Sequence, residues 1–478
     1  MRRALLPLTL LLASCSWGGD VEPGDDSDGS ARTSGSGSHD GATTATGTGA
    51  GEYVGGGAQG GGWQGGGGQG GNVADDPPVL ASTQEVCKLI NDLDQSDPTP
   101  NATQTRANVL GTDLGIPVGH GSDLFLFFGD TVGYKVIWPF SESVPDAVGF
   151  AADGRAAVTA DPAVLCDGLR FLRVAPGASA GPIADPAIEA DFAAGAMYPP
   201  SGHDLSEYIK NPAGPTGQNA FPALPGSFEV PSGAFSHGGS IYVFYTTVQS
   251  PNALTMKASY LAKWPTPSTS GTPNYDIIHR VDERFDGTGP LGGNFINIAA
   301  EPNGAYVYMF GTGEYRESPV HLARKALASL DAPGGYEVYD AASSQWLAAP
   351  AANAAPIIAE PTFGETSVRY FPDKGIWMFL AQGGHRVVAR FANQPEGPWS
   401  NEITLHDNTD PAFLAQYCCV PEGTCTGERL FNCSVAGFYG TYLFPDLAVD
   451  GTGFTVTYTM STWDPYNVAL FTARFESP

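Results

Sequence analysis

The stretch Gly111–Thr131, GTDLGIPVGHGSDLFLFFGDT, is the starting point for the interpretation of this chain. Its run Leu124–Phe128 is wholly apolar and aromatic and is bounded by glycines, which is typical of a strand buried on both faces. Asp113 precedes this strand between two glycines, and Asp130 follows it in Gly-Asp-Thr. Because glycines leave an acid uncovered, we expect the two carboxylates to converge on one pocket. Turn aspartates that cap backbone amides are common and explain the spacing at least as well.

Similar apolar runs recur along the chain, and each is followed by a second strand pattern. The five pairs are Leu124–Phe128 with Leu169–Val174, Ile241–Tyr245 with Met256–Ala262, Ala305–Phe310 with Val320–Arg324, Ile376–Leu380 with Arg386–Phe391, and Phe454–Met460 with Val468–Phe475. The first run of a pair is apolar nearly throughout, as a central strand must be. The second alternates more, as an outer strand does.

Five such units predict an all-β fold, a five-bladed β-propeller whose blades carry loop insertions. Successive first runs lie mostly about 65 to 80 residues apart, with a longer gap after the first run. The region Lys135–Val230 would hold the main insertion, and apart from Leu169–Val174 its Pro/Gly/Ala-rich sequence predicts no secondary structure. A two-sheet sandwich is the alternative fold, but it does not explain five similar units.

The N-terminus has the pattern of an exported lipoprotein. Arg2 and Arg3 precede the apolar run Ala4–Leu12, which is too short to span a membrane and reads as a secretory signal. The run ends in LASC at Cys15, which resembles a bacterial lipoprotein signal, so residues 1–14 are expected to be removed and Cys15 lipidated. Ser16, where an acidic residue would favour retention, points to the outer membrane or cell surface. An ordinary secretory signal with a chance cysteine is the alternative.

Composition divides the remaining chain into a tether and a head. Residues 15–80 are rich in Gly, Ser and Asp and bury too little apolar surface to fold, so we expect a disordered tether before a head at 81–478. The net charge is −27 and the pI is about 4.4. An acidic head repels phosphate backbones, which argues against nucleic acid and suits a neutral glycan. The head is expected to be a monomer.

Six cysteines follow Cys15, and an even number in an exported chain predicts disulfides. They are Cys87, Cys166, Cys418, Cys419, Cys425 and Cys433. The last four lie close together and predict a stapled surface loop, which leaves Cys87–Cys166 as the natural remaining pair among fifteen connectivities. A zinc site is the competing interpretation, but the chain has no CxxC spacing. H-E-x-x-H does not occur and no paired histidine spacing is present, so no metal or other cofactor is expected.

Several short motifs of the head resemble the domain-of-unknown-function family numbered 4185. In chain order they are GTDLGIPV, FGDT, Val230–Gly233 before IYVFY, YMFGTGEYRESPVHLAR, Gly364–Val368, EGPWS at Glu396–Ser400, and Ser461–Val468. The matches run from about Asn108 to Phe475. The resemblance implies a five-bladed propeller similar to glycosidases and the endo-D-arabinanase activity of glycoside hydrolase family 183. The long insertions and the loop Cys418–Cys433 depart from the family pattern, which bears on the substrate more than on the fold.

Glycoside hydrolysis needs one carboxyl that protonates the leaving oxygen and a second that attacks the anomeric carbon or activates water. The resemblance maps the motif acids onto Asp113 and Asp130. Glu365, in GETSV, is a candidate proton donor or pKa tuner, although a rim acid fits equally well. Glu314 and Asp446 are candidates for substrate binding, and pairing with Arg316 or with a loop amide is the alternative for both.

The aromatic residues Trp138, Tyr198, Trp463 and Tyr466 are candidates for stacking on sugar rings. Trp377 lies inside a buried run and is expected to belong to the core. His120, His237 and His385 lie in glycine-rich turns and are expected to be turn residues rather than bases.

These observations predict a surface-tethered glycoside hydrolase. It would use paired carboxylates on a furanoside-rich polysaccharide and cleave arabinan-type glycans internally. The alternative is a non-catalytic glycan-binding or adhesive propeller on the same tether. A hydrolase needs two carboxyls roughly 5–10 Å apart, whereas a lectin needs only hydrogen-bonding groups and an aromatic platform.

The lipid-anchor hypothesis predicts that mass spectrometry of the mature N-terminus finds an acylated Cys15. Cys15→Ala should release the protein from the membrane fraction, because the acyl chain is then missing. A mature chain that begins at another residue, or a wild type as soluble as the variant, would refute the hypothesis.

Overall fold

The computed structural model describes the part of the chain that forms the head. The described residues are 76–90, 101, 103, 109, 111–131, 146–172, 224, 228–250, 255–270, 276–284, 289–360, 363–419, 429–434, 437–463 and 465–477. Cys15, Trp138 and Tyr198 lie outside them, as does almost all of the expected tether. Within the described residues, no helix has the length and hydropathy needed to cross a membrane.

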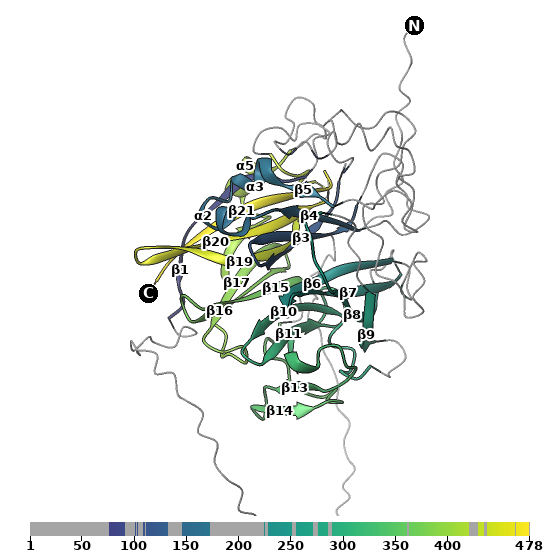
Figure 1. Ribbon diagram of the computed structural model, residues 1–478. Coiled ribbons are helices and arrows are strands. Elements are labelled where there is room, and N and C mark those ends of the chain that lie inside the picture. Colours follow the sequence, from purple (N-terminus) through teal and green to yellow (C-terminus); the bar gives the residue numbers. More distant parts are fainter. Residues whose placement is uncertain are drawn as a thin grey trace, which may run out of the picture. The chain divides into compact units, whose positions relative to one another are not determined.

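The described strands form five antiparallel sheets (Figure 1). From the innermost strand outward they are β2 (Leu114–His120), β3 (Asp123–Asp130), β4 (Asp146–Ala151) and β5 (Arg170–Phe171) in blade I; β6 (Phe228–His237), β7 (Ser240–Ser250), β8 (Thr255–Trp264) and β9 (Asp276–Glu283) in blade II; β10 (Asn297–Asn303), β11 (Tyr306–Thr312), β12 (His321–Ala326), β13 (Tyr336–Asp340) and β14 (Gln345–Ala348) in blade III; β15 (Phe363–Phe371), β16 (Ile376–Gly383), β17 (Arg386–Ala392) and β18 (Ile403–Asp407) in blade IV; and β19 (Phe438–Asp450), β20 (Gly453–Thr462), β21 (Asn467–Glu476) and β1 (Val79–Lys88) in blade V. The described helices are α2 (Arg155–Ala160), α3 (Val164–Gly168) and α5 (Pro411–Tyr417), with a 3₁₀ turn η1 (Leu327–Ser329).

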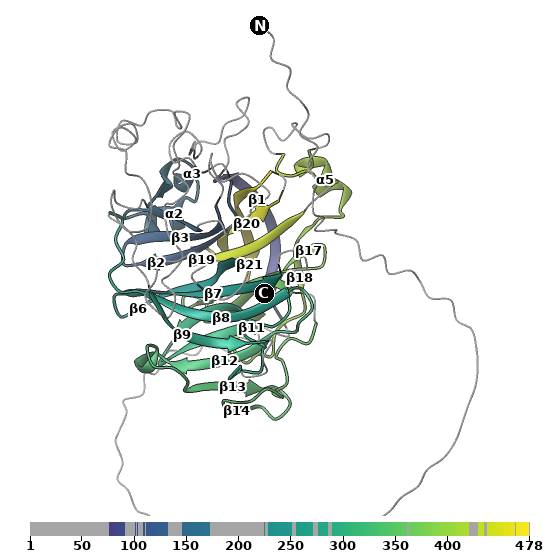
Figure 2. The same ribbon diagram turned by 90° about the vertical axis from the view of Figure 1, so that its right-hand side faces the viewer.

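The blades close into a ring, which confirms the predicted five-bladed propeller. The innermost strands contact one another in the cyclic order β2, β6, β10, β15, β19 and back to β2. Strand β1, from the start of the head, pairs with β21, from its end, and completes blade V. Figure 2 shows this purple strand beside the yellow strands of blade V. The closing blade therefore joins both ends of the head through backbone hydrogen bonds.

The five apolar runs lie in different sheets, as predicted. They form β3, β7, β11, β16 and β20, which are the second strands of their blades. Each has a hydrogen-bonded strand on both sides and neighbouring blades packed against its faces, so most of its side chains are buried. The apolar runs do not include the innermost strands, because glycine or proline and polar residues interrupt the apolar signal of each of these strands.

The prediction for the second runs is correct in four blades and wrong in blade I. The four correct runs lie in β8, β12, β17 and β21, each of which is the third strand of its blade. In blade I the third strand is β4, whereas Leu169–Val174 contributes only the two-residue outer strand β5. Gly149 interrupts the apolar pattern of β4, and glycine weakens a strand signal. Both strands lie inside the expected insertion Lys135–Val230.

Two of the expected disulfide links are present. Cys87 on β1 bonds to Cys166 on α3, with Cα atoms 6.1 Å apart, so the closing strand is tied covalently to blade I. Cys418 bonds to Cys433 and closes the segment that follows α5, which confirms the stapled loop. Cys419 is also disulfide-bonded, and Cys425 lies outside the described residues.

Arg369 of β15 crosses the centre of the ring. Its Nη2 donates to the carbonyl of Pro117 on β2 (2.6 Å), and its Nε donates to the carbonyl of Leu443 on β19 (3.2 Å). Its Nη1 pairs with Glu301 on β10 (3.0 Å), and the Arg369 side chain is only 7% exposed. Burial raises the pKa of Glu301, although Arg369 lowers it. One guanidinium therefore connects four of the five innermost strands.

We predict that Arg369→Met destabilises the head by about 3–5 kcal/mol, because it leaves the Glu301 carboxylate buried without its cation. Urea unfolding monitored by fluorescence measures this difference. The matched control is Arg386→Met: the ion pair of Arg386 with Glu402 is partly exposed and is worth about 0–1 kcal/mol. Adding Glu301→Gln to Arg369→Met should recover part of the loss. Equal stability of the two single variants would contradict a role for the central guanidinium.

Candidate active site

The turn that presents Asp113 is built by hydrogen bonds between the two ends of the β2–β3 hairpin. The Thr112 hydroxyl donates to the Gly129 carbonyl (2.8 Å), and Gly129 N donates to the Asp113 carbonyl (3.1 Å). A side chain at position 129 could not be accommodated, because its Cβ would lie 2.4 Å from Asp113 Oδ1. The motifs Gly-Thr-Asp and Gly-Asp-Thr are therefore two halves of one turn, and Asp113 and Asp130 lie at the same end of the hairpin.

The backbone directly after Asp113 adopts a conformation that side chains disfavour. Leu114 has φ of 66° and Gly115 has φ of 75°, and a register shift follows between Leu114 and Ile116. Blade V holds this turn: Leu114 N donates to Ser461 Oγ (2.8 Å), and Thr459 Oγ1 donates to the Gly115 carbonyl (3.1 Å). A non-glycine residue at positive φ costs free energy and is often found at functional sites. Two blades thus determine the direction of the Asp113 side chain.

Tyrosine hydroxyl groups of blade V lie beside the Asp113 carboxylate. The Tyr439 hydroxyl donates to Asp113 Oδ2 (3.0 Å), whereas Asp113 Oδ1 has no hydrogen-bond partner among the described residues. Burial and the neighbouring charge of Glu365 raise the pKa of Asp113 to about 7, against the lowering effect of the hydroxyls of Tyr439 and Tyr466. Asp113 therefore exchanges its proton near neutral pH.

Asp130 lies in a different environment, among acids. It is the last residue of β3 and is partly exposed. Burial raises its pKa well above the usual range, and the charges of Asp113 and Glu229 raise it further. Asp146, the first residue of β4, is 1% exposed, and Glu229, on β6, is 0% exposed. Blades I and II thus surround Asp130 with carboxyl groups.

Glu365 reaches the same cluster from blade IV and is supported by blade III. The Tyr315 hydroxyl donates to Glu365 Oε1 (2.8 Å), and the Arg316 guanidinium lies over the Tyr315 ring, 4.5 Å from its centroid. Arg316 has φ of 59°, and its charge interacts with Glu365. A Cβ at position 364 would lie 3.2 Å from Arg316 Nε, so Gly364 permits this close approach. Residues from all five blades contribute to the cluster.

The structure therefore brings together the three acids that the sequence analysis selected, Asp113, Asp130 and Glu365. It also places Tyr466 beside Asp113. The Trp463 ring lies edge-on to the Tyr466 ring, with centroids 5.4 Å apart. Both aromatic candidates of the β20–β21 turn thus adjoin the carboxyl cluster.

Glu314 already has protein partners for both of its carboxylate oxygens. Its Oε2 pairs with Arg284 (2.9 Å) rather than with Arg316, and its Oε1 accepts from Met256 N (3.0 Å). This arrangement corresponds to the alternative of ion pairing and amide capping rather than to a free substrate-binding carboxylate.

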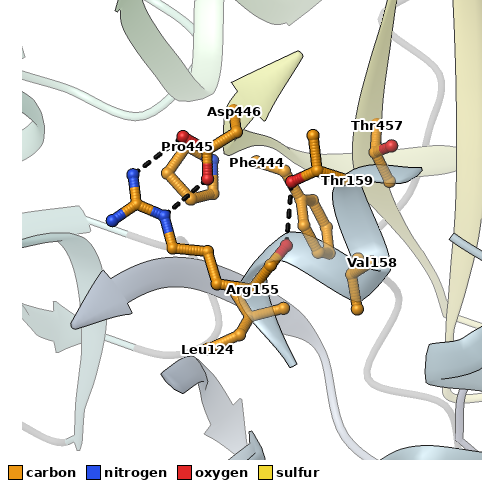
Figure 3. A pocket seen from close by; sticks show the side chains of 8 residues that line it. All are labelled: Leu124, Arg155, Val158, Thr159, Phe444, Pro445, Asp446 and Thr457. Carbon is orange, nitrogen blue, oxygen red and sulfur yellow. Dashed lines mark hydrogen bonds and ion pairs between the residues drawn. The ribbon is translucent and has the colours of Figure 1, made fainter. Parts of the chain in front are cut away.

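Asp446 lies outside the carboxyl cluster. It is seven residues beyond Tyr439 on β19, which is roughly 20 Å along a strand. The Arg155 guanidinium of α2 donates to both carboxylate oxygens of Asp446, from Nε to Oδ2 (2.5 Å) and from Nη2 to Oδ1 (2.7 Å). Figure 3 shows this Arg155–Asp446 pair at a small pocket, which the side chains of Leu124, Val158 and Phe444 also line. Asp446 therefore links blade V to blade I.

The remaining sequence candidates have ordinary structural positions. Trp377 is 1% exposed in the core, as expected. His120 ends β2 and its Nδ1 lies 2.8 Å from Ser236 Oγ, while His237 ends β6 and His385 lies in the β16–β17 turn. Within the described ranges, no three His, Cys, Asp or Glu side chains are arranged to hold a metal ion.

Sequence reasoning did not select Asp146, Glu229, Tyr439 or Tyr315. The first three stand at or next to the start of a strand, in β4, β6 and β19. The signal that singled out Asp113 and Asp130 was an acid framed by glycine. Asp146 and Glu229 are not framed in this way, and Tyr439 is not an acid, so this signal could not find them.

Five blades around a cluster of partly buried carboxyl groups define this protein as a β-propeller with an acidic central site. The chain belongs to the family described as Domain of unknown function (DUF4185), whose family model matches residues 211–472. This match confirms the resemblance, although the motifs of Asp113 and Asp130 precede the matched range. No curated protein matches the chain.

Several solved structures are similar to this chain at low sequence identity. A Bacteroides ovatus protein, provisionally assigned as a hydrolase, is 15% identical with a TM-score of 0.47 and covers 77% of this chain and 87% of its own. The Podospora anserina α-L-arabinofuranosidase is 11% identical with a TM-score of 0.40 and coverages of 84% and 98%. The Coprinopsis cinerea α-L-arabinofuranosidase of family GH62 is 11% identical with a TM-score of 0.41 and coverages of 83% and 97%.

The raised pKa of Asp113 predicts how stability changes with pH. Because the folded protein binds this proton more tightly than the unfolded chain, the stabilising contribution is complete below pH 3.8 and is lost as the pH rises to about 7. The melting temperature of the wild type should fall over this range, and that of Asp113→Asn should fall less.

The control is Asp161→Asn, an exposed residue whose oxygen accepts from Ala163 N, which should leave the pH slope unchanged. If Asp113 were only a turn cap, Asp113→Asn would lower the melting temperature at every pH without changing the slope.

Proposed function

We propose that this protein is a glycoside hydrolase that cleaves a neutral polysaccharide with Asp113 and Asp130. The observation that carries the proposal is that these two carboxyls, at one end of a single hairpin, lie in opposite environments. Hydroxyl donors surround Asp113, whereas further acids surround Asp130. Two neighbouring carboxyls whose surroundings separate their proton affinities are what acid–base cleavage of a glycosidic bond requires.

The environments suggest the division of roles. Asp113, whose carboxylate accepts the Tyr439 hydroxyl, is suited to the ionised role, as a base that activates water or as a nucleophile. Asp130, whose acidic neighbours favour its protonated form, is suited to protonating the leaving oxygen. Glu365 tunes the pair, because its charge raises the pKa of Asp113.

The surroundings of the pair suit a sugar polymer. Trp463 and Tyr466 supply aromatic surface beside Asp113, and sugars commonly stack on such rings. The net charge of −27 disfavours anionic polymers. The motif resemblance leads us to propose a furanoside-rich substrate, with internal cleavage of arabinan-type chains by a monomeric head tethered to the cell surface through Cys15.

A non-catalytic glycan-binding propeller is the second candidate. Buried acceptor oxygens without partners among the described residues, such as Asp113 Oδ1 and Glu365 Oε2, would equally accept hydrogen bonds from sugar hydroxyls. The two functions differ in what they require of the carboxyl protons. Binding needs acceptors, whereas hydrolysis also needs a group that gives up a proton.

The test is an assay of the purified protein on arabinans, xylans and pectins, with analysis of product size. We predict that Asp113→Asn and Asp130→Asn each lower turnover by about 10²- to 10⁴-fold, because each removes a proton-transfer group and keeps the shape. Asp161→Asn, an exposed aspartate of the same blade, should keep wild-type turnover. Wild-type binding of a glycan without any cleavage would favour the second candidate, and Asn variants with normal turnover would refute both roles.

A further inference from the structure

The side chain of Asp146 lies opposite that of Asp130 because of an irregularity in blade I. Strands β3 and β4 pair Phe127 with Val148 and then Asp130 with Asp146. Between these two pairs, β3 has two residues and β4 has only one. Strand β3 therefore carries a bulge. Without the extra residue, Gly129 would face Asp146. Bulges re-aim side chains and are frequent beside active sites.

Asp146 is buried more deeply than Asp130. It is 1% exposed, and neither of its carboxyl oxygens has a hydrogen-bond partner among the described residues. An ionised carboxylate can only accept hydrogen bonds, whereas a protonated one is also a donor. Since buried polar groups are normally hydrogen-bonded, a proton on Asp146 would supply the donor that the contact with Asp130 lacks.

The charged groups around Asp146 all favour its protonated form. In the described part of the chain they are Asp130 on β3, Glu229 on β6 and Asp113 before β2, and all are acids. Burial raises the pKa of Asp146 well above the usual range, and these charges raise it further. Residues directly opposite in an antiparallel pair have Cβ atoms roughly 4.5–5.5 Å apart, so two ionised carboxylates here would repel strongly.

We propose that Asp146 is a positioning residue that keeps its own proton and donates it in a hydrogen bond to Asp130. This bond orients Asp130 and stabilises the carboxylate that remains after Asp130 has protonated the leaving oxygen. The inference rests on the proposed glycosidase function. In the step itself, the O–H bond of Asp130 breaks and a new O–H bond forms on the glycosidic oxygen. That oxygen takes the electron pair of the breaking C–O bond, and the proton of Asp146 stays in the hydrogen bond.

The first test compares Asp146→Leu with Asp146→Asn. Leu has a similar shape but no donor, so Asp130 should give up its proton less readily. The alkaline limb of the pH–turnover profile should then move up by about one to two pH units, and turnover should fall about tenfold or more. Asn keeps an N–H donor and should restore both values to near wild type. Asp161→Asn is the control for an aspartate of the same blade that is remote from the cluster.

Two outcomes would overturn the role of Asp146. An unchanged alkaline limb in Asp146→Leu, even with a lower melting temperature, would mean that the residue is only structural. An alkaline limb that moves down in Asp146→Asn would mean that Asp146 acts as a negative charge and not as a donor.

A second measurement does not depend on turnover and covers the case in which Asp146→Leu fails to fold. Infrared spectra at neutral pH should show the carbonyl band of a buried carboxylic acid in the wild type, and Asp146→Asn should lose part of it. Persistence of the full band in Asp146→Asn, or its absence from the wild type, would refute the proton on Asp146. If the wild type cleaved no glycan, the proposed function would fail, and the infrared result alone would decide the proton assignment.

Discussion

The propeller depends on the polar contacts that join its innermost strands at the centre of the ring. Five innermost strands meet there, and Arg369 connects four of them through one ion pair and two bonds to backbone carbonyls. The strand that Arg369 does not reach, β6, is tied to β10 by Ile298 N, which donates to Ser232 Oγ (3.3 Å). A fixed ring of strands is what allows their first residues to be positioned relative to one another.

The central site follows from this ring. Asp113, Glu229, Glu365 and Tyr439 stand just before or near the start of four different innermost strands. Because the strands are held in a ring, these side chains converge and are largely shielded from bulk water, so the charges of neighbouring acids affect one another. Burial is accordingly the largest cause of the raised pKa of Asp113, Asp130 and Asp146. Acids packed this closely repel one another when they are ionised, which favours their protonated forms.

Asp113 and Asp130 are distinguished by small differences within this common environment. Asp113 and Asp130 belong to one hairpin, yet blade V gives the first a hydroxyl donor and blades I and II surround the second with carboxyls. The strained turn at Leu114 and the bulge before Asp130 decide which neighbour each side chain meets. Backbone irregularities of one residue therefore separate two aspartates that both lie close to glycines in the sequence.

The sequence by itself determined the repeat, the second strand of each blade, the pairing of Cys87 with Cys166 and the candidate acids Asp113, Asp130 and Glu365. These features can be read from local patterns, because a run of apolar residues or a glycine-framed acid depends only on residues that are neighbours in the sequence. Only the tertiary structure decided that Asp146 faces Asp130, that Tyr439 holds Asp113 and that Asp446 pairs with Arg155. The physical reason is that these contacts join different blades or depend on a one-residue register shift, and neither leaves a trace in local hydrophobicity.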